Sequence, residues 1–123
     1  MNICPFCKIE NLWFENEHYQ IVRDGFPISP GHSLVVPKQH VSSLYDLEIN
    51  IQAHLWQAVA EVRRQLKLEF NPDGFNIGLN DGQPAGQTVL HAHIHIIPRY
   101  QGDVEDPRGG VRWIIPRKAK YWD

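Results

Sequence analysis

The chain lacks long apolar runs, has few cysteines and carries no excess of positive charge. No apolar stretch approaches the roughly 20 residues that a membrane-spanning helix needs, so no membrane partner is expected. Twelve lysines and arginines stand against 14 aspartates and glutamates, a formal net charge of −2, which disfavours binding to long nucleic acids. The first residues show no signal-peptide pattern, and a cytoplasmic location is therefore expected.

The remaining composition is typical of one folded domain. With 123 residues, 42% of them hydrophobic and 21% charged, the chain is long enough to bury an ordinary core without disulfides. It contains no internal repeat. We expect a single domain over residues 1–123, in which residues 100–123, rich in glycine, proline and charge, form a C-terminal tail.

Periodicity predicts four strands and one long helix. The strands are expected over residues 17–24, 32–37, 75–79 and 88–99. Apolar residues recur at helical spacing from Asp46 to about Phe70, which predicts an amphipathic helix, and Ser43 resembles its capping residue. Strands with short connections and one long helix predict an α+β fold with an antiparallel sheet.

Three of the seven histidines alternate along the last predicted strand, at His91, His93 and His95. Residues two apart on a strand share a face, so these imidazoles should line one face while Ala92 and Ile94 line the other. Near neutral pH an imidazole can act as nucleophile, proton donor or metal ligand. The three alternating histidines therefore predict a catalytic or metal-binding site. Chelation of one metal by all three is the competing interpretation, which the lack of an added carboxylate ligand nearby disfavours.

Three blocks of the sequence, taken together, resemble the histidine triad nucleotide-binding family. In chain order they are CPFCKI at 4–9, PGHSLVVPKQH at 30–40 and QTVLHAHIHIIPR at 87–99. Their order and separation also fit, and the resemblance covers about residues 3–100. It implies a histidine-triad-like α+β fold, with an antiparallel sheet of about five strands and one long amphipathic helix. It also implies a homodimer.

The resemblance implies a nucleotidyl hydrolase or transferase that acts on an α-phosphate. His93, the middle histidine of the row, is implied as the nucleophile that forms a covalent nucleotidyl-histidine, which water then cleaves. The other residues implied as catalytic are His95, His32 and Gln87. The residues implied as substrate-binding are Asp24, Asn80, Thr88 and His91. Among these, Asp24 matches the residue that binds the ribose hydroxyls.

Cys4 and Cys7 have the C-x₂-C spacing of half a tetrahedral zinc site. No further cysteine exists, so histidines must complete any such site. The resemblance to zinc-carrying relatives implies His40 and His91 as the remaining ligands of a structural Zn²⁺. Plain reduced thiols or a redox pair are the alternative.

The expected substrate is a (di)nucleotide such as a diadenosine polyphosphate, a branch that Gln87 and the preceding residues 84–86 favour mildly. One alternative is an adenosine phosphoramidase. A second, from another class, is a zinc-stabilised nucleotide-binding module with little turnover. Deadenylation of DNA ends is disfavoured, because the chain has no added basic or zinc-finger sequence.

Overall fold

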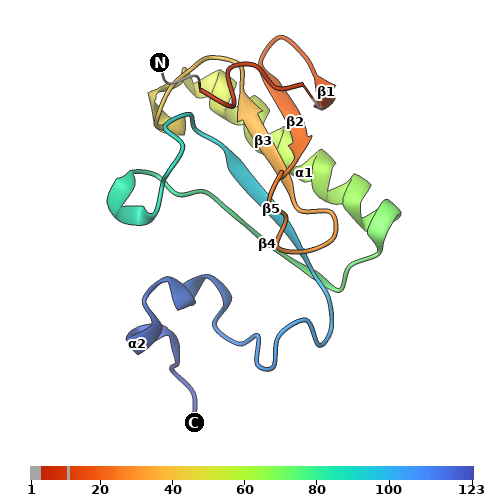
Figure 1. Cartoon of the computed structure of the whole chain (residues 1–123), viewed down its shortest axis with the longest axis vertical. Helices are drawn as coiled ribbons and strands as arrows, with labels where there is room; N and C mark the ends of the chain where they lie inside the picture. The colour runs from red at the N-terminus through yellow and green to blue at the C-terminus, as the bar shows by residue number, and fades with distance from the viewer. Residues whose placement is uncertain (1–3, 11) are drawn as a thin grey trace.

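The computed structural model describes residues 4–10 and 12–123, which form a five-stranded antiparallel sheet and one long helix (Figure 1). The strands are β1 Leu12–Glu15, β2 Tyr19–Arg23, β3 Ser33–Pro37, β4 Gly74–Gly78 and β5 Ile94–Arg99. They lie in the order β1-β2-β3-β5-β4, and every neighbouring pair is antiparallel. The predicted α+β fold class is confirmed.

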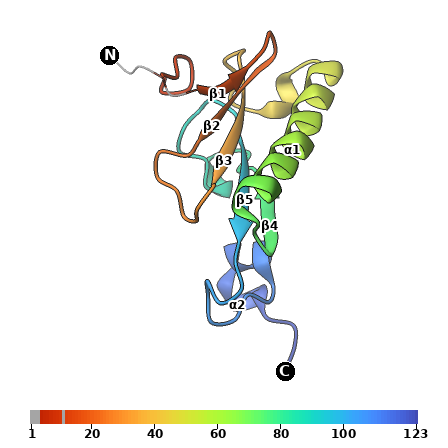
Figure 2. The ribbon, with the colours of Figure 1, turned by 90° about the vertical axis from the view of Figure 1, so that its right-hand side faces the viewer.

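The long helix α1, Ile49–Phe70, covers one face of the sheet and leaves the other face to loops (Figure 2). Its buried stripe consists of Leu55, Ala58, Val59, Val62 and Leu66. This stripe joins Val35 of β3 and Ile94 and Ile96 of β5 in the core. Along β5 buried and half-buried residues alternate, so the side chain of His95 points away from α1.

The helix begins at Ile49, three residues later than predicted. Ser43 instead caps a separate 3₁₀ helix, η1 Leu44–Asp46, where its hydroxyl accepts a hydrogen bond of 3.2 Å from the backbone N–H of Tyr45. The two residues 47–48 that follow are extended. Helical periodicity therefore continues across a backbone break that the sequence pattern does not show.

Two strand predictions are corrected by the structure. β1 is not predicted because its four residues are mostly exposed and show no alternation of burial. The last strand begins at Ile94 rather than Thr88, because the residues before it leave the sheet ladder. Among them, the N–H of Ala92 donates instead to the carbonyl of Val41, at 2.8 Å.

Beyond β5 the chain forms η3 Gly110–Ile114 and α2 Pro116–Ala119, which contact each other at the end of the molecule away from β1 (Figure 1). The single domain over residues 1–123 with a tail over 100–123 stays a prediction, and residues 1–3 and 11 lie outside the described residues. Within the described segments, no helix combines the length and the apolar character needed to cross a bilayer.

Gly31, in the loop before β3, is expected to resist substitution. Its φ is +89°, and an added Cβ would lie 2.9 Å from Cδ2 of Phe70. Because alanine is strained at this φ and would also clash, Gly31→Ala should lower the free energy of unfolding by about 1–3 kcal/mol. Urea titration followed by circular dichroism measures the change.

Gly25 in the same loop offers a matched control, since an added Cβ there meets no atom within 4 Å. Gly25→Ala should change the free energy of unfolding by less than about 0.5 kcal/mol. Equal losses of unfolding free energy in the two variants would show that neither the φ of Gly31 nor its closeness to Phe70 requires glycine there.

Candidate functional site

The histidines of the site lie where β2, β3 and β5 meet on the sheet face opposite α1. Asp24 directly follows β2, His32 directly precedes β3, and His95 lies in β5 opposite Leu34 of β3. Because these three strands are neighbours, the turn between β2 and β3 brings Asp24 and His32 beside His95. His93 lies two residues before His95, just outside the strand.

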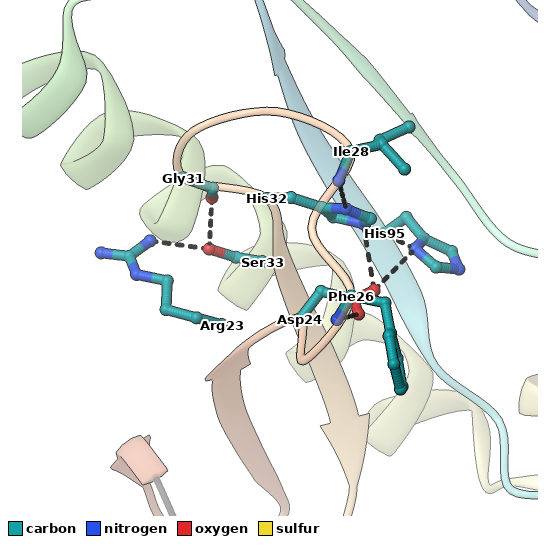
Figure 3. Close-up of polar contacts among 8 residues, drawn as sticks. All are labelled: Arg23, Asp24, Phe26, Ile28, Gly31, His32, Ser33 and His95. Carbon is teal, nitrogen blue, oxygen red and sulfur yellow. Dashed lines mark hydrogen bonds and ion pairs between the residues drawn. The ribbon is translucent and has the colours of Figure 1, made fainter.

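Asp24, His32 and His95 form one cluster of polar contacts (Figure 3). Nε2 of His32 lies 2.9 Å from Nδ1 of His95 and 3.3 Å from Oδ2 of Asp24. The same carboxylate oxygen lies 3.9 Å from Nδ1 of His95. The His32 side chain is only 4% exposed, so these contacts form with little competition from water.

The loop between β2 and β3 determines which nitrogen of each imidazole carries the proton. The backbone N–H of Ile28 donates to Nδ1 of His32 at 3.2 Å (Figure 3). Since a backbone N–H can only donate, the proton of a neutral His32 is on Nε2, which donates in turn to Nδ1 of His95. The remaining N–H of His95, on Nε2, is then available as a donor on the far side of its ring.

The hydrogen bonds from Ile28 to His32 and from His32 to His95 form a relay, and burial keeps both of its imidazoles neutral. It lowers the pKa of His95 to about 4, with further lowering by His93 and His32 and an opposing effect of Asp24. Burial also lowers the pKa of His32, again opposed by the Asp24 carboxylate. Near pH 7 both rings are therefore neutral, as the hydrogen-bond directions require.

His93 is held in the opposite tautomer. Its Nδ1–H donates to the backbone carbonyl of His91 at 2.8 Å, and a carbonyl can only accept. In the neutral ring, Nε2 of His93 therefore carries the lone pair. The ring is half-buried, and its centroid lies 5.1 Å from that of His95. The structure thus places a nitrogen lone pair and an N–H donor side by side.

A second cluster contains all four predicted metal ligands: Cys4, Cys7, His40 and His91. Nδ1 of His91 lies 3.4 Å from Sγ of Cys4, 3.6 Å from Sγ of Cys7 and 3.2 Å from Nδ1 of His40. Sγ of Cys7 lies 3.1 Å from Nδ1 of His40. A tetrahedral Zn²⁺ with Zn–N of about 2.0 Å and Zn–S of about 2.3 Å separates its ligand atoms by about 3.3–3.8 Å. The separations found here, 3.1–3.6 Å, lie within about 0.4 Å of those values, so a small adjustment lets the four donor atoms hold such an ion.

The hydrogen bond of His91 supports this fit. Its Nε2–H donates to the carbonyl of Pro37 at 2.8 Å, which leaves the Nδ1 lone pair directed at the cluster, the usual arrangement of a metal-ligating histidine. The residue is completely buried, and this burial lowers its pKa, which favours the neutral form that a metal ligand requires. With both ring nitrogens engaged, His91 offers no polar ring atom to a substrate.

Asp24, His32 and His95 are also close enough to one another to share a metal ion. The hydrogen bond from Ile28 argues against that use, because it leaves the proton on Nε2 of His32, the nitrogen that would have to ligate the ion. The two histidine clusters are therefore prepared for different chemistry. One presents lone pairs to a metal, and the other presents a proton donor.

Gln87, Asn80 and Thr88 lie in the loop that precedes the histidines. Gln87 is buried, and its amide accepts from the N–H of Gly82 and donates to the carbonyls of Ser42 and Val89. These bonds hold the loop together and leave the amide no free hydrogen. Asn80 and Thr88 are exposed. In the described part of the chain, no hydrogen bond joins any of the three to His93.

Sequence reasoning missed the N–H of Ile28 as part of the site. A backbone group carries no residue signature, so only its placement by the loop identifies it. The Pro-Gly step just before His32 was the available signal that a tight turn brings backbone amides close to that imidazole.

Comparison with known proteins relates most of this chain to one family. Residues 8–102 match the HIT domain. The relative named Protein hit, from Bacillus subtilis, is 38% identical over 107 residues, which span 81% of this chain and 74% of that protein. The bis(5'-nucleosyl)-tetraphosphatase (asymmetrical) of Schizosaccharomyces pombe is 42% identical over 80 residues, 65% of this chain and 44% of that enzyme.

A solved structure has a similar fold, and its name includes a bound zinc ion. It is that of a Zn-bound histidine triad family protein from Mycobacterium smegmatis, with a TM-score of 0.76 and 33% identity, covering 84% of this chain and 79% of that one. The family match spans the strands, the helix and every predicted site residue except Cys4 and Cys7. The chain therefore belongs to the HIT domain family.

Proposed function

We propose that this protein is a nucleotide hydrolase of the histidine triad type, with His93 as its nucleophile. The observation that carries the proposal is the hydrogen bond from Nδ1–H of His93 to the carbonyl of His91, which in the neutral ring puts the lone pair on Nε2. A neutral imidazole with a directed lone pair is a competent nucleophile. Membership of the HIT domain family supports the same hypothesis of a nucleotide hydrolase.

The proposed reaction has two steps. Nε2 of His93 forms a bond to the α-phosphorus while the bond to the leaving phosphate oxygen breaks. The resulting nucleotidyl-imidazolium keeps its Nδ1–H on the His91 carbonyl, which stabilises the positive charge. A water molecule then forms a bond to phosphorus as the N–P bond breaks. The mononucleotide leaves, the water proton passes to solvent and His93 is neutral again.

His95 and His32 are proposed to assist by donating protons in hydrogen bonds. Nε2–H of His95 is directed away from His32 and can meet a phosphate oxygen as its negative charge grows in the transition state. His32 supports this hydrogen bond to the phosphate, because its own hydrogen bond keeps His95 in the tautomer with the proton on Nε2. We therefore assign to His32 a positioning role, rather than a contact of its own with the phosphate.

The remaining proposed roles follow from the placement of each residue. Asp24 is retained as the acceptor for ribose hydroxyls, and exposed Asn80 and Thr88 as contacts for the phosphates and the leaving group. Gln87 is assigned to holding the loop, because its amide is already engaged. His91 is kept among the metal ligands and removed from the substrate-binding residues.

We infer a dinucleoside polyphosphate, such as a diadenosine polyphosphate, as the substrate. The support is the relative named as a tetraphosphatase, of which this chain spans less than half the length. Adenosine phosphoramidates are the alternative substrates, and a binding module with little turnover is the alternative from another class. The homodimer and the cytoplasmic location remain predictions.

We further infer that the ion held by Cys4, Cys7, His40 and His91 is Zn²⁺ in a structural role. Two thiolates and two imidazoles are a donor set that zinc prefers, and four protein ligands leave no position open for substrate. The ion would connect the N-terminal segment to the residues that follow β3 and to those that precede β5.

Purified protein should therefore contain about one zinc per chain, and Cys4→Ser or Cys7→Ser should remove most of it, because a three-ligand site binds far more weakly. Elemental analysis by mass spectrometry measures the content. His54→Ala is the control, since this exposed helix residue stacks on His18 and not on the cluster. Full zinc content in both cysteine variants would exclude the site.

His93→Ala should lower turnover of diadenosine polyphosphates by at least about 10³-fold while nucleotide affinity changes only a few-fold. The reason is that only the bond-forming nitrogen is lost. Product chromatography gives turnover, calorimetry gives affinity, and intact-protein mass spectrometry should detect a nucleotidyl adduct on the unmodified protein only. His18→Ala is the matched control. Loss of affinity in parallel with turnover would contradict the nucleophile assignment and favour a binding role.

The neutral relay predicts a pH dependence of stability. His95 has a pKa of about 4 in the fold, below its unfolded value, so the unfolded chain binds more protons as pH falls from 6.5 to 4. The free energy of unfolding should therefore decrease over this window, and His95→Gln should make the decrease shallower. Urea titrations at several pH values test this. An unchanged slope in His95→Gln, with His54→Gln as control, would contradict the pKa assignment.

A further inference from the structure

The loop that carries the two cysteines also contacts the proposed nucleophile. Phe6 lies between Cys4 and Cys7 and is half-buried. Its ring centroid lies 4.9 Å from that of His93, with an interplanar angle of 63°, and 6.1 Å from that of His91, at 90°. Both are edge-to-face arrangements, which aromatic rings favour. The short segment 4–7 therefore supplies two sulfur ligands for a metal and also an aromatic ring that packs against His93.

The hydrogen bond that orients His93 is accepted by a residue of the metal-ligand cluster, His91. Nδ1–H of His93 donates to the carbonyl of His91, whose own ring is held between the carbonyl of Pro37 and the other three ligands. These residues precede Ile94 and lie outside the sheet ladder. The direction of the His91 carbonyl therefore depends on how its ring is anchored as much as on the sheet.

The position of Phe6 depends on how its neighbours Cys4 and Cys7 are anchored, as the His91 carbonyl depends on the anchoring of its ring. Within the described part of the chain, the side-chain hydrogen-bonding contacts from residues 4–10 to the rest of the protein run from Cys4 or Cys7 to His40 or His91. Thiols are weak hydrogen-bond partners. Coordination of the same four side chains to an ion replaces these contacts by much stronger bonds, so the location of Phe6 should follow metal occupancy.

We propose that metal binding by Cys4, Cys7, His40 and His91 orients the imidazole of His93, through the Phe6 ring on one side and the His91 carbonyl on the other. Phe6 is then a positioning residue for the reaction. This inference rests on the proposed function, in which His93 is the nucleophile. Its physical basis is that attack requires the Nε2 lone pair to be aligned with phosphorus, and a ring free to rotate about its side-chain bonds loses that alignment.

The first test needs no substrate. The imidazole Nδ1–H of His93 should give a slowly exchanging proton resonance in nitrogen-15-labelled, Zn²⁺-loaded protein, because the His91 carbonyl protects it. Removal of Zn²⁺ by a chelator should broaden or abolish this resonance, and added Zn²⁺ should restore it. An unchanged resonance in stripped protein that remains folded by circular dichroism would overturn the proposal.

The second test separates positioning from substrate contact and applies even if stripped protein unfolds. Phe6→Leu keeps all four ligands, so zinc content should stay at the level of the unmodified protein. The His93 resonance should broaden, and kcat should fall by about 10-fold or more with KM changed less than about two-fold. Phe14→Leu, in a half-exposed position of β1, is the matched control and should change neither.

A raised KM with unchanged kcat and an unchanged His93 resonance would instead show that Phe6 contacts the substrate, and would overturn the positioning role. Failure of the proposed function itself has a different signature. No nucleotidyl adduct would form on the unmodified protein, whereas the response of the His93 resonance to Zn²⁺ and to Phe6→Leu would still decide the coupling.

Discussion

A neutral imidazole has one N–H and one lone pair, and in this protein backbone groups of fixed polarity decide which nitrogen carries which. The carbonyls of Pro37 and His91 can only accept, so a neutral His91 directs its Nδ1 lone pair at the cysteines and a neutral His93 keeps its lone pair on Nε2. The N–H of Ile28 can only donate, so the relay through His32 ends in an N–H on His95. The same type of side chain is thus prepared for metal ligation at His91, for nucleophilic attack at His93 and for hydrogen-bond donation at His95.

The sheet makes this arrangement possible because α1 covers only one of its faces (Figure 2). Burial of Ile94 and Ile96 against the helix holds β5 in register, and the alternation of the strand then sends His95 to the other face. There the N-terminal segment and the β2–β3 loop take the place of a second helix. Loops can present backbone N–H and C=O groups that a helix would use internally, and here the N–H of Ile28 and the carbonyl of His91 orient the imidazoles of the site.

The predictions from sequence succeeded where the physical signal is local and periodic. Burial of Leu55, Val62 and Leu66 confirms the helical stripe. The predicted alternation holds for half-buried His93 and His95, between buried Ala92 and Ile94, but is wrong for His91, which is itself buried. The prediction of a continuous strand from Thr88 failed, because tertiary hydrogen bonds such as that of Ala92 replace the ladder there. Periodicity cannot distinguish a strand from an extended segment that bonds elsewhere.

By itself the sequence determined the family, the fold class and the side chains available for chemistry, since spacing and residue type carry that information directly. Which of those side chains meet, and in which protonation state, was decided only by the tertiary structure. His91, already implied as a metal ligand, has no nitrogen left for substrate because of the carbonyl of Pro37, and Gln87 holds the loop because its amide reaches the carbonyl of Ser42. The physical reason is that the partners are backbone atoms about 45 or more residues away, whose positions depend on the packing of the whole sheet.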